Sequence, residues 1–287
     1  FLMNENSESL SRFSDILLLG HDWKEDEERL LGLLFAGYSG RLGVIGSKSK
    51  WKCVVVTSER LLNSEIQNGK RFLDYLKTEN IFFIVSNSLK NSNVVDQAVS
   101  SDIAFCIGGS WIFDQQDIKL HKKLYNLHAT PLPLYRGGAS FSWQIMANDD
   151  RGGVTLHELT TAIDGGKVLM QNRFILPINE NISVINKYVQ KKIHDFVENF
   201  LSFNDQAIIN INCNELEIEE SIYMPRLDWQ THGWIDWQWE IDEIERFIRA
   251  FSFGKSGVFS RKTGSSNIYK LSQARVYNRK TVHPFQA

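Results

Sequence analysis

The sequence predicts an α/β protein: a first domain built around a mostly parallel sheet, followed by a smaller C-terminal α+β domain. Three observations support this prediction. Short apolar runs alternate with helical patterns in the first part of the chain, two longer strand-like runs and a long helical pattern follow, and the last part combines one helix with short strands. The 287 residues suffice for one large domain or two modest ones, and we place the domains at 1–204 and 205–287.

Five short and nearly continuous apolar runs predict strands that are buried on both faces. They are DILLLG (15–20), WKCVVVTS (51–58), IFFIVSN (81–87), DIAFCIGG (102–109) and LYNLH (124–128). Helical patterns such as GKRFLDYLKTEN and NVVDQAVSS lie between them. Because strands that alternate with helices usually form βαβ units, we expect a mostly parallel sheet.

The pattern changes in the second half of the chain. GGVTLHEL and KVLMQNRFILPI predict two strands joined by the turn TTAIDGG, and apolar residues at helical spacing predict an amphipathic helix over 183–203. A second helical stripe runs from Ile241 to Phe251, with Gly254 as its expected end. The last 34 residues contain seven Lys or Arg and no acidic residue, and they predict a few short strands.

Composition excludes several classes of protein. The formal net charge of −2 argues against a protein that binds nucleic acid through its overall charge. The three cysteines show no Cys-x-x-Cys spacing, so we expect no disulfide framework, no cysteine zinc site and a reducing compartment. Because neither a signal peptide nor a run of about 18 apolar residues is present, we expect a cytoplasmic protein without a membrane partner. The glycine-rich stretch 37–46 matches no phosphate-binding fingerprint and predicts a flexible loop.

The stretch LYNLHATPLPLYRGG (124–138) contains candidate site residues. Asn126 and His128 are two positions apart, so they point to the same face of a strand. The carboxyl end of such a strand is where open α/β sheets bind ligands. Each residue also has an ordinary interpretation: a structural His, a capping or turn Asn, and, for Asp164 in the sequence AIDGG, the turn residue of a hairpin.

Together, these three side chains offer a reaction. An amide can donate to a developing oxyanion, an imidazole can move a proton, and a carboxylate can orient the imidazole and stabilise its charged form. This set suits acyl transfer to an amine. Because the motif places no Ser, Cys or Lys nucleophile, direct transfer from a bound acyl donor is the simplest mechanism.

Two stretches resemble the signatures of the N10-formyltetrahydrofolate-dependent formyltransferases. The residues from Asn126 to Gly137 are similar to N-x-H-x-S-x-L-P-x-x-x-G, with Thr130 where Ser is usual. GVTLHELTTAIDGGKVL is similar to G-V-T-x-H-x(6)-D-x-G, which puts Asp164 at the catalytic Asp position and His157 at the strand His. The likeness extends over roughly residues 12–262 and implies the family's Rossmann-like fold and its formyl-transfer activity.

The resemblance also implies a set of site residues and N10-formyltetrahydrofolate as co-substrate, with no metal. Asn126 is expected to stabilise the oxyanion, His128 to act as general base, and Asp164 to orient His128. The expected folate contacts are Gly108, Gly109, Ser110, Trp111, Ile112, Phe113, Thr161, Ala162 and Ile163. The expected contacts with the acceptor substrate are Thr130, Arg136 and Gly137.

Two further stretches point to the kind of acceptor. CIGGSWIF (106–113) and YMPRLDWQTHGWIDWQW (223–239) resemble segments of the sugar N-formyltransferases. This implies transfer to the amine of a nucleotide-linked amino deoxysugar, with dTDP as the expected nucleotide and O-antigen biosynthesis as the expected setting. Because similar sugar enzymes are usually dimers, we expect a homodimer.

Two alternatives remain open. A methionyl-tRNA formyltransferase has the same three catalytic residues, and the chain has a basic tail, although its overall charge makes nucleic acid an unexpected partner. The tail consists of Lys255, Arg261, Lys262, Lys270, Arg275, Arg279 and Lys280. The other alternative is a non-catalytic domain that binds folate or a sugar nucleotide, because a fold alone does not imply activity.

Overall fold

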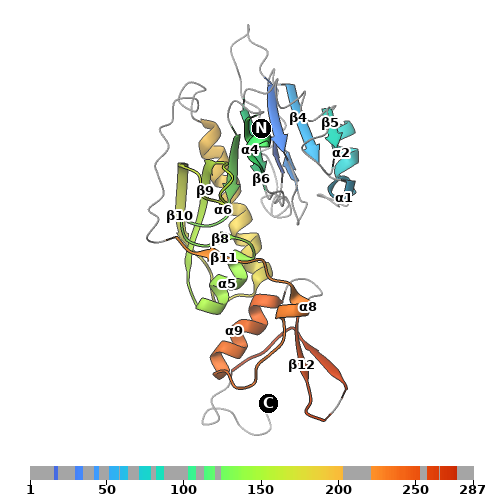
Figure 1. Cartoon of the computed structure of the whole chain (residues 1–287), viewed down its shortest axis with the longest axis vertical. Helices are drawn as coiled ribbons and strands as arrows, with labels where there is room; N and C mark the ends of the chain where they lie inside the picture. Colours follow the sequence, from blue (N-terminus) through green and yellow to red (C-terminus); the bar gives the residue numbers. More distant parts are fainter. Residues whose placement is uncertain are drawn as a thin grey trace, which may run out of the picture.

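The computed structural model of the chain is shown in Figure 1. It describes residues 16–18, 30–34, 42–44, 52–57, 59–63, 71–78, 82–86, 103–107, 113–119, 124–202, 221–252, 257–264 and 266–276. A large sheet occupies the upper part of the view, and the C-terminal helix α9 and strand β12 lie at the lower end.

The main sheet has seven strands in the order β10-β9-β7-β6-β2-β4-β5. Neighbouring strands in the run from β7 to β5 are parallel. These strands are β2 (Leu30–Leu34), β4 (Lys52–Thr57), β5 (Phe82–Val85), β6 (Ile103–Ile107) and β7 (Leu124–His128). The antiparallel hairpin of β9 (Arg151–Glu158) and β10 (Val168–Ile175) continues the sheet beyond β7. The α/β class and the mostly parallel sheet are therefore confirmed.

The first strands differ from the prediction. The run at 15–20 forms β1 (Ile16–Leu18), which pairs with β3 (Leu42–Val44) in a separate two-stranded parallel sheet. The strand that joins β4 to β6 is instead β2, which the apolar runs did not indicate. Its sequence LLGLL has a central glycine and no β-branched or aromatic residue, so it has a weak strand pattern. β3 also lies within the stretch 37–46 that was expected to be a loop.

Among the described residues, three short helices accompany the parallel strands: α1 (Glu59–Leu62), α2 (Phe72–Thr78) and α4 (Gln115–Lys119). Helix α2 confirms the helix predicted from GKRFLDYLKTEN, whereas NVVDQAVSS lies outside the described residues. The buried cluster in this half joins strand residues to the segment before α4. Its members are Val56, Ile84, Cys106, Phe113 and Leu124.

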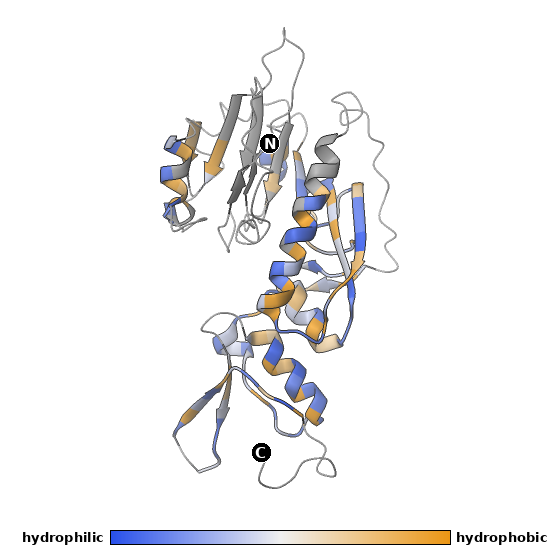
Figure 2. Cartoon of the chain, turned by 180° about the vertical axis from the view of Figure 1, so that it is seen from behind, coloured by the Kyte–Doolittle hydropathy of each residue, from blue (hydrophilic) through white to orange (hydrophobic). Residues whose placement is uncertain are grey.

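A second core lies where α5 (Ser140–Ala147), α6 (Ile182–Ser202) and α9 (Ile241–Phe251) meet. Its buried members are Ile145, Leu176, Ile185, Val189, Phe247, Ile248, Ala250, Phe251 and Val258. Figure 2 shows apolar and polar residues alternating along α6 and α9, as the helical spacing predicted. Both predicted helices are confirmed, while Gly254 lies outside the described residues. The C-terminal helix therefore shares a core with α5 and α6.

The remaining C-terminal elements begin with β11 (Tyr223–Met224), which pairs in parallel with β8 (Arg136–Gly137). Helix α8 (Trp229–His232) and the antiparallel hairpin of β12 (Val258–Arg261) and β13 (Ile268–Leu271) follow. The predicted boundary at 204 falls in 203–220, outside the described residues. Within the described part of the chain, no helix has both the length and the apolar character needed to cross a membrane.

Candidate active site

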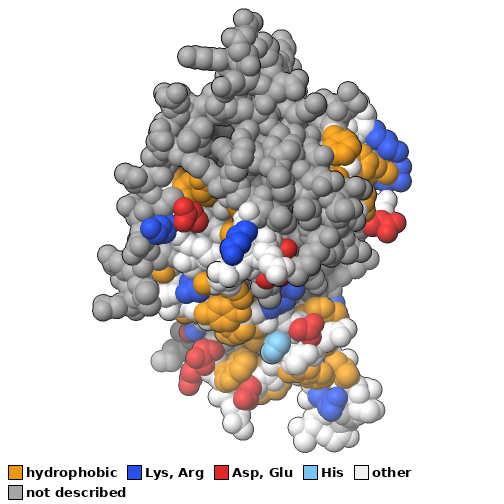
Figure 3. All heavy atoms as spheres, turned by 45° about the horizontal axis from the view of Figure 1, so that its top comes forward, with side chains coloured by type: hydrophobic (Ala, Val, Ile, Leu, Met, Phe, Trp, Pro, Cys, Tyr) orange, Lys and Arg blue, Asp and Glu red, His pale blue; other side chains and the backbone are white. Residues whose placement is uncertain are grey.

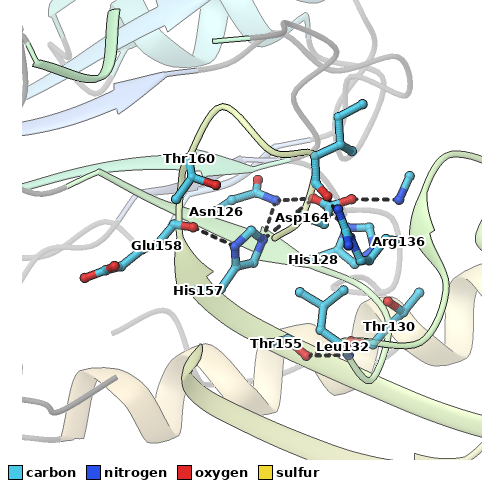
Figure 4. A network of polar contacts seen from close by, with 12 residues as sticks. Asn126, His128, Thr130, Leu132, Arg136, Thr155, His157, Glu158, Thr160 and Asp164 are labelled. Atoms are coloured by element: carbon cyan, nitrogen blue, oxygen red, sulfur yellow. Dashed lines mark hydrogen bonds and ion pairs between the residues drawn. The ribbon is translucent and has the colours of Figure 1, made fainter. Parts of the chain in front are cut away.

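Neighbouring strands bring the predicted catalytic residues together. Asn126 and His128 lie on β7, and His128 is its last residue. Opposite them on the antiparallel strand β9 are His157 and Thr155, respectively. Asp164 comes from the turn between β9 and β10, where its φ of 48° is in the left-handed region. Figure 4 shows the carboxylate of Asp164 directed toward the side chains on β7.

The Asp164 carboxylate is the centre of this network. Its Oδ2 accepts the backbone N–H of Gly137 at 2.8 Å, and its Oδ1 accepts from Asn126 Nδ2 at 3.2 Å. Nδ1 of His128 lies 3.6 Å from Oδ1, and Nε2 of His157 lies 3.7 Å from it. Burial raises the pKa of Asp164, but the nearby imidazole of His128 and the hydrogen bond from the Gly137 N–H lower it by more. The pKa of this carboxyl is therefore well below its usual range, and Asp164 is an anion.

His157 holds the side-chain amide of Asn126. Only 1% of His157 is exposed, and its Nδ1 lies 2.8 Å from the Glu158 carbonyl oxygen. Because a carbonyl can only accept, Nδ1 carries the hydrogen and Nε2 carries the lone pair. Asn126 Nδ2 donates to this Nε2 at 3.0 Å. Both partners of the amide nitrogen are therefore acceptors, which leaves the amide oxygen pointing away from His157 and Asp164 (Figure 4).

The orientation of His128 differs from the prediction. Its Nε2 lies 3.1 Å from the carbonyl oxygen of Tyr135, a hydrogen-bond distance, so Nε2–H donates to that carbonyl. The 3.6 Å between Nδ1 and Asp164 suits an attraction between charges but is too long for a hydrogen bond. The hydrogen bond that orients the ring is thus made to Tyr135, not to Asp164. If Nδ1 takes up a proton, the positive charge of the imidazolium lies beside the Asp164 carboxylate.

Tyr135 itself has an unusual backbone. Its φ is 57°, in the left-handed region that bulky residues rarely adopt and that costs roughly 1–2 kcal/mol. The neighbouring Gly137 has a φ of 94°, and a Cβ there would come within 2.3 Å of the Met224 carbonyl oxygen. Glycine is needed at this position, because β11 passes directly against it. Tyrosine, unlike glycine, does not adopt a positive φ readily, so contacts with the surrounding residues must hold Tyr135 in this conformation.

The three predicted acceptor-binding residues are used inside the protein. Thr130 is only 1% exposed, and its hydroxyl donates to the Leu134 carbonyl, so its position does not fit contact with a substrate. Arg136 donates to the Ile163 carbonyl at 2.8 Å and to the Ser221 hydroxyl at 2.8 Å. Gly137 presents its N–H to Asp164, as described above. Arg136 and Gly137 therefore connect the Asp164 turn to β8 and to the segment that carries β11.

Comparison with known families identifies the middle of the chain. Residues 75–201 match the family model described as formyl transferase, a range that includes Asn126, His128 and Asp164. Residues 75–201 therefore resemble a formyl transferase domain. Among curated proteins, methionyl-tRNA formyltransferase from Azobacteroides pseudotrichonymphae genomovar. CFP2 is 30% identical over 136 residues. That match covers 45% of this chain and 40% of the relative, so the chain spans less than half the length of the relative it matches.

Solved structures share the fold of the formyl transferase domain. A 4-N formyltransferase from Francisella tularensis aligns with a TM-score of 0.65 at 18% identity, covering 86% of this chain and 99% of the other. An N-formyltransferase from Helicobacter canadensis, in complex with folinic acid and dTDP-3-aminofucose, aligns with a TM-score of 0.55 at 20% identity. This second match covers 79% of this chain and 81% of the other. At such identities the likeness establishes the fold, which is that of the formyltransferases.

The residues expected to contact folate fall into three groups within the matched region. Residues 108–112 lie outside the described part of the chain. Phe113 is 5% exposed and belongs to the buried cluster with Cys106 and Leu124, so its ring packs in the core and the expectation of a folate contact needs correction. Residues 161–163 are exposed and directly precede Asp164, so they can border a ligand at the site.

Two residues of the network were not among the predicted site residues. His157 stands in the second signature, but a His on a strand usually serves the core, and only the pairing of Asn126 with His157 shows its contact with the site. The part played by Tyr135 comes from its main-chain carbonyl, which no side-chain pattern can indicate.

Proposed function

We propose that this chain is a sugar N-formyltransferase. It transfers the formyl group of N10-formyltetrahydrofolate to the amine of a nucleotide-linked amino deoxysugar, with dTDP as the favoured nucleotide. The observation that carries the proposal is the convergence of Asn126, His128 and Asp164 within 3.2–3.6 Å inside the matched domain. The choice of a sugar acceptor is supported by the structural neighbour that holds folinic acid and dTDP-3-aminofucose.

The proposed reaction is a direct transfer. The amine nitrogen bonds to the formyl carbon, and after the tetrahedral intermediate the bond from that carbon to folate N10 breaks. The proton lost by the amine goes to Nδ1 of His128, where the Asp164 anion 3.6 Å away stabilises the imidazolium. His128 then returns a proton to N10 as it leaves. General acid–base help of this kind contributes roughly 10²- to 10⁴-fold in rate.

Asn126 supplies the donor for the oxyanion in this proposal. Its hydrogen bond to Asp164, at 3.2 Å, is longer than its bond to His157, at 3.0 Å. The N–H that faces Asp164 is therefore the one that can be shared with a developing oxyanion, while the bond to His157 keeps the amide in place. A donor placed in this way contributes roughly 10²- to 10³-fold in rate.

A methionyl-tRNA formyltransferase is the second candidate, and a surface feature favours it. Trp229 and Trp234 pack against Phe259, and both indoles are more than one third exposed. Lys270 lies 5.6 Å from the Trp229 ring and Arg261 lies 5.4 Å from the Trp234 ring. Figure 3 shows apolar side chains at the surface of the lower part, with both Lys or Arg and Asp or Glu side chains among them. Exposed rings beside cations suit a nucleic-acid partner.

One experiment decides between these candidates. The purified protein is offered N10-formyltetrahydrofolate together with a panel of dTDP- and UDP-linked amino sugars or with methionyl-tRNA, and mass spectrometry follows the formyl group. A formylated sugar nucleotide supports the proposal, and formylated methionyl-tRNA, with binding that weakens steeply with salt, supports the second candidate. Protection of the protein against heat by folate without any formylated product would instead indicate a non-catalytic binding domain.

A further inference from the structure

Tyr135 connects the site to a group of charged residues that the proposed reaction does not use. Its carbonyl oxygen accepts from His128 Nε2 at 3.1 Å. At the other end of the same residue, the hydroxyl donates to Asp149 Oδ2 at 2.5 Å. Asp149 follows α5, 14 residues further along the chain. Tyr135 therefore links His128, the proposed base, to the carboxylate of Asp149.

Asp149 is in turn held in place by Arg151. The guanidinium of Arg151 donates to Oδ1 at 2.9 Å and to Oδ2 at 2.6 Å, and the backbone N–H of Arg151 donates to Oδ1 at 3.0 Å. These hydrogen bonds from Arg151, together with the one from Tyr135, lower the pKa of Asp149 to about 2. Burial and the hydrogen bond to Asp149 raise the pKa of Tyr135 well above its ordinary value. At neutral pH the contact thus joins a phenol donor to a carboxylate acceptor.

The backbone of Tyr135 needs such an anchor. A left-handed φ of 57° is strained for a tyrosine, and strained residues persist only where their surroundings hold them. Hydrogen bonds fix the chain on either side, from Leu134 N to the Pro131 carbonyl and from Arg136 N to the Ile222 carbonyl. The Tyr135 carbonyl oxygen also accepts from the hydroxyls of Thr130 and Ser140, each at 3.4 Å, so the side-chain hydroxyl of Tyr135 adds to a set of contacts that hold this residue. The ring is 3% exposed, and its hydroxyl is the polar handle that fixes it.

We propose that the hydrogen bond from Tyr135 to Asp149 is a positioning device for His128. It holds Tyr135 in the left-handed conformation, which aims the Tyr135 carbonyl at Nε2 of His128. The ring is thereby kept in the tautomer with hydrogen on Nε2, and Nδ1 is left as the atom that takes up the amine proton beside Asp164. Tyr135 and Asp149 are positioning residues in this scheme, which rests on the proposed function where it concerns the reaction.

Asp164 is poorly placed to set the tautomer of His128. Its Oδ2 already accepts from Gly137, and its Oδ1 already accepts from Asn126. It lies 0.5 Å further from the His128 ring than the Tyr135 carbonyl does, as the distances 3.6 and 3.1 Å show. The third neighbour of the ring, His157, has its centroid 6.5 Å away and holds its own hydrogen on Nδ1. The Tyr135 carbonyl is therefore the group that sets the tautomer of His128.

The test uses two variants that remove the anchor and two matched controls. Tyr135→Phe deletes only the hydroxyl, whereas Asp149→Leu deletes the acceptor of Tyr135 together with the partner of Arg151. Asp149→Asn keeps an oxygen that can accept from Tyr135, so it should rescue the positioning. Tyr188→Phe makes the same chemical change at a tyrosine of α6 that packs on Phe174, away from the site.

The first measurement is the NMR spectrum of ¹⁵N-labelled histidine rings, with His128 assigned through a His128→Gln variant. We expect Nε2–H for His128 in the wild type, in Asp149→Asn and in Tyr188→Phe. In Tyr135→Phe and Asp149→Leu, we expect a shift toward Nδ1–H, while His157 keeps its Nδ1–H signal as an internal reference. A His128 ring with Nδ1–H in the wild type, or one that is unaffected by Tyr135→Phe, overturns the proposal.

The second measurement is formyl transfer. We expect Tyr135→Phe and Asp149→Leu to lower kcat about 10- to 100-fold with little change in the KM of the formyl donor, because a small misplacement of a reacting group is enough. A fall in melting temperature without any change in kcat or in the His128 spectrum would show a merely structural contact and would overturn the proposal. Absence of formyl transfer in the wild type would refute the proposed function, while the NMR result would still decide on the positioning of His128.

Discussion

Asn126 and His157 face each other across the antiparallel strands β7 and β9, with 3.0 Å between Nδ2 of the amide and Nε2 of the imidazole. Because the Nδ1–H of His157 is used by the Glu158 carbonyl, Nε2 can only accept. This fixes which way round the amide sits, with its nitrogen toward His157 and Asp164. A buried histidine thus decides which face of Asn126 is offered to a substrate.

Replacement of His157 tests this relationship. His157→Leu removes the acceptor and leaves an Asn126 N–H without its partner, so we expect kcat for formyl transfer to fall about 10- to 100-fold, with a smaller change in KM. His157→Gln offers an oxygen that can accept from the same N–H and should retain most of the lost activity. Steady-state kinetics on variants with equal melting temperatures measure both effects. Equal kcat in the Leu variant and the wild type would contradict the role of His157.

The three proposed catalytic residues should each be needed for turnover. We expect Asn126→Ala to lower kcat roughly 10²- to 10³-fold through loss of the oxyanion donor, and His128→Ala to lower it roughly 10²- to 10⁴-fold through loss of the base. Asp164→Asn keeps the shape but removes the charge that stabilises imidazolium, so a similar loss is expected. Circular dichroism and thermal unfolding control for folding. Full activity in a well-folded His128→Ala protein would sink the mechanism.

Much of this fold can be predicted from sequence because local patterns and tertiary environment agree. The run LYNLH is apolar and short, as suits a strand buried between β6 and β9. The hairpin that carries Asp164 follows from its two long strand-like runs and the Asp-Gly turn between them. Strand β2 was missed because it has a central Gly and no β-branched or aromatic residue, and its place between β4 and β6 makes it a strand.

Some features of the candidate site could likewise be predicted from the sequence, and others could not. The placement of Asn126 and His128 follows from strand alternation, so it was predictable. The contact between His128 and Tyr135 was not, because it depends on a left-handed backbone and a main-chain oxygen. Thr130 was misjudged for a related reason: its hydroxyl satisfies the carbonyls of its own turn, which a linear motif does not distinguish from a substrate contact.

Gly137 offers a test of how the C-terminal segment supports the site. Gly137→Ala places a Cβ within 2.3 Å of the Met224 carbonyl at a φ of 94°, so β11 must move and the N–H held by Asp164 must move with it. We expect a loss of stability of more than about 2 kcal/mol and a large loss of activity. Gly264→Ala is the matched control, because its φ is also positive, at 74°, but no atom lies within 4 Å of the added Cβ.

Chemical denaturation of both glycine variants separates the cost of backbone strain from the cost of the clash with β11. Gly264→Ala should cost only the strain of the left-handed backbone, roughly 1–2 kcal/mol, and leave formyl transfer unchanged. The additional loss in Gly137→Ala then reports the clash with β11. If the two substitutions have equal effects on stability and neither affects activity, the pairing of β8 with β11 does not support the site.

The contact between Asp149 and Arg151 should make the stability of the protein depend on pH in acid. Hydrogen bonds from Arg151 and Tyr135 lower the pKa of Asp149 to about 2, below the value of about 4 expected in the unfolded chain. A depressed carboxyl pKa stabilises the folded state above the unfolded pKa, and this stabilisation is lost as pH falls from about 4 toward 2. Because the Arg151 side chain is 59% exposed, we expect only about 1–2 kcal/mol from this group.

Asp149→Asn removes the titration while leaving an acceptor for Tyr135. In urea unfolding, the wild type should therefore be more stable than the variant at pH 6, and the difference should shrink at pH 3. Asp164, whose pKa is also low, titrates in both proteins and cancels from the comparison. Parallel stability curves from pH 6 to pH 3 would show that Asp149 is not held as an anion by Arg151.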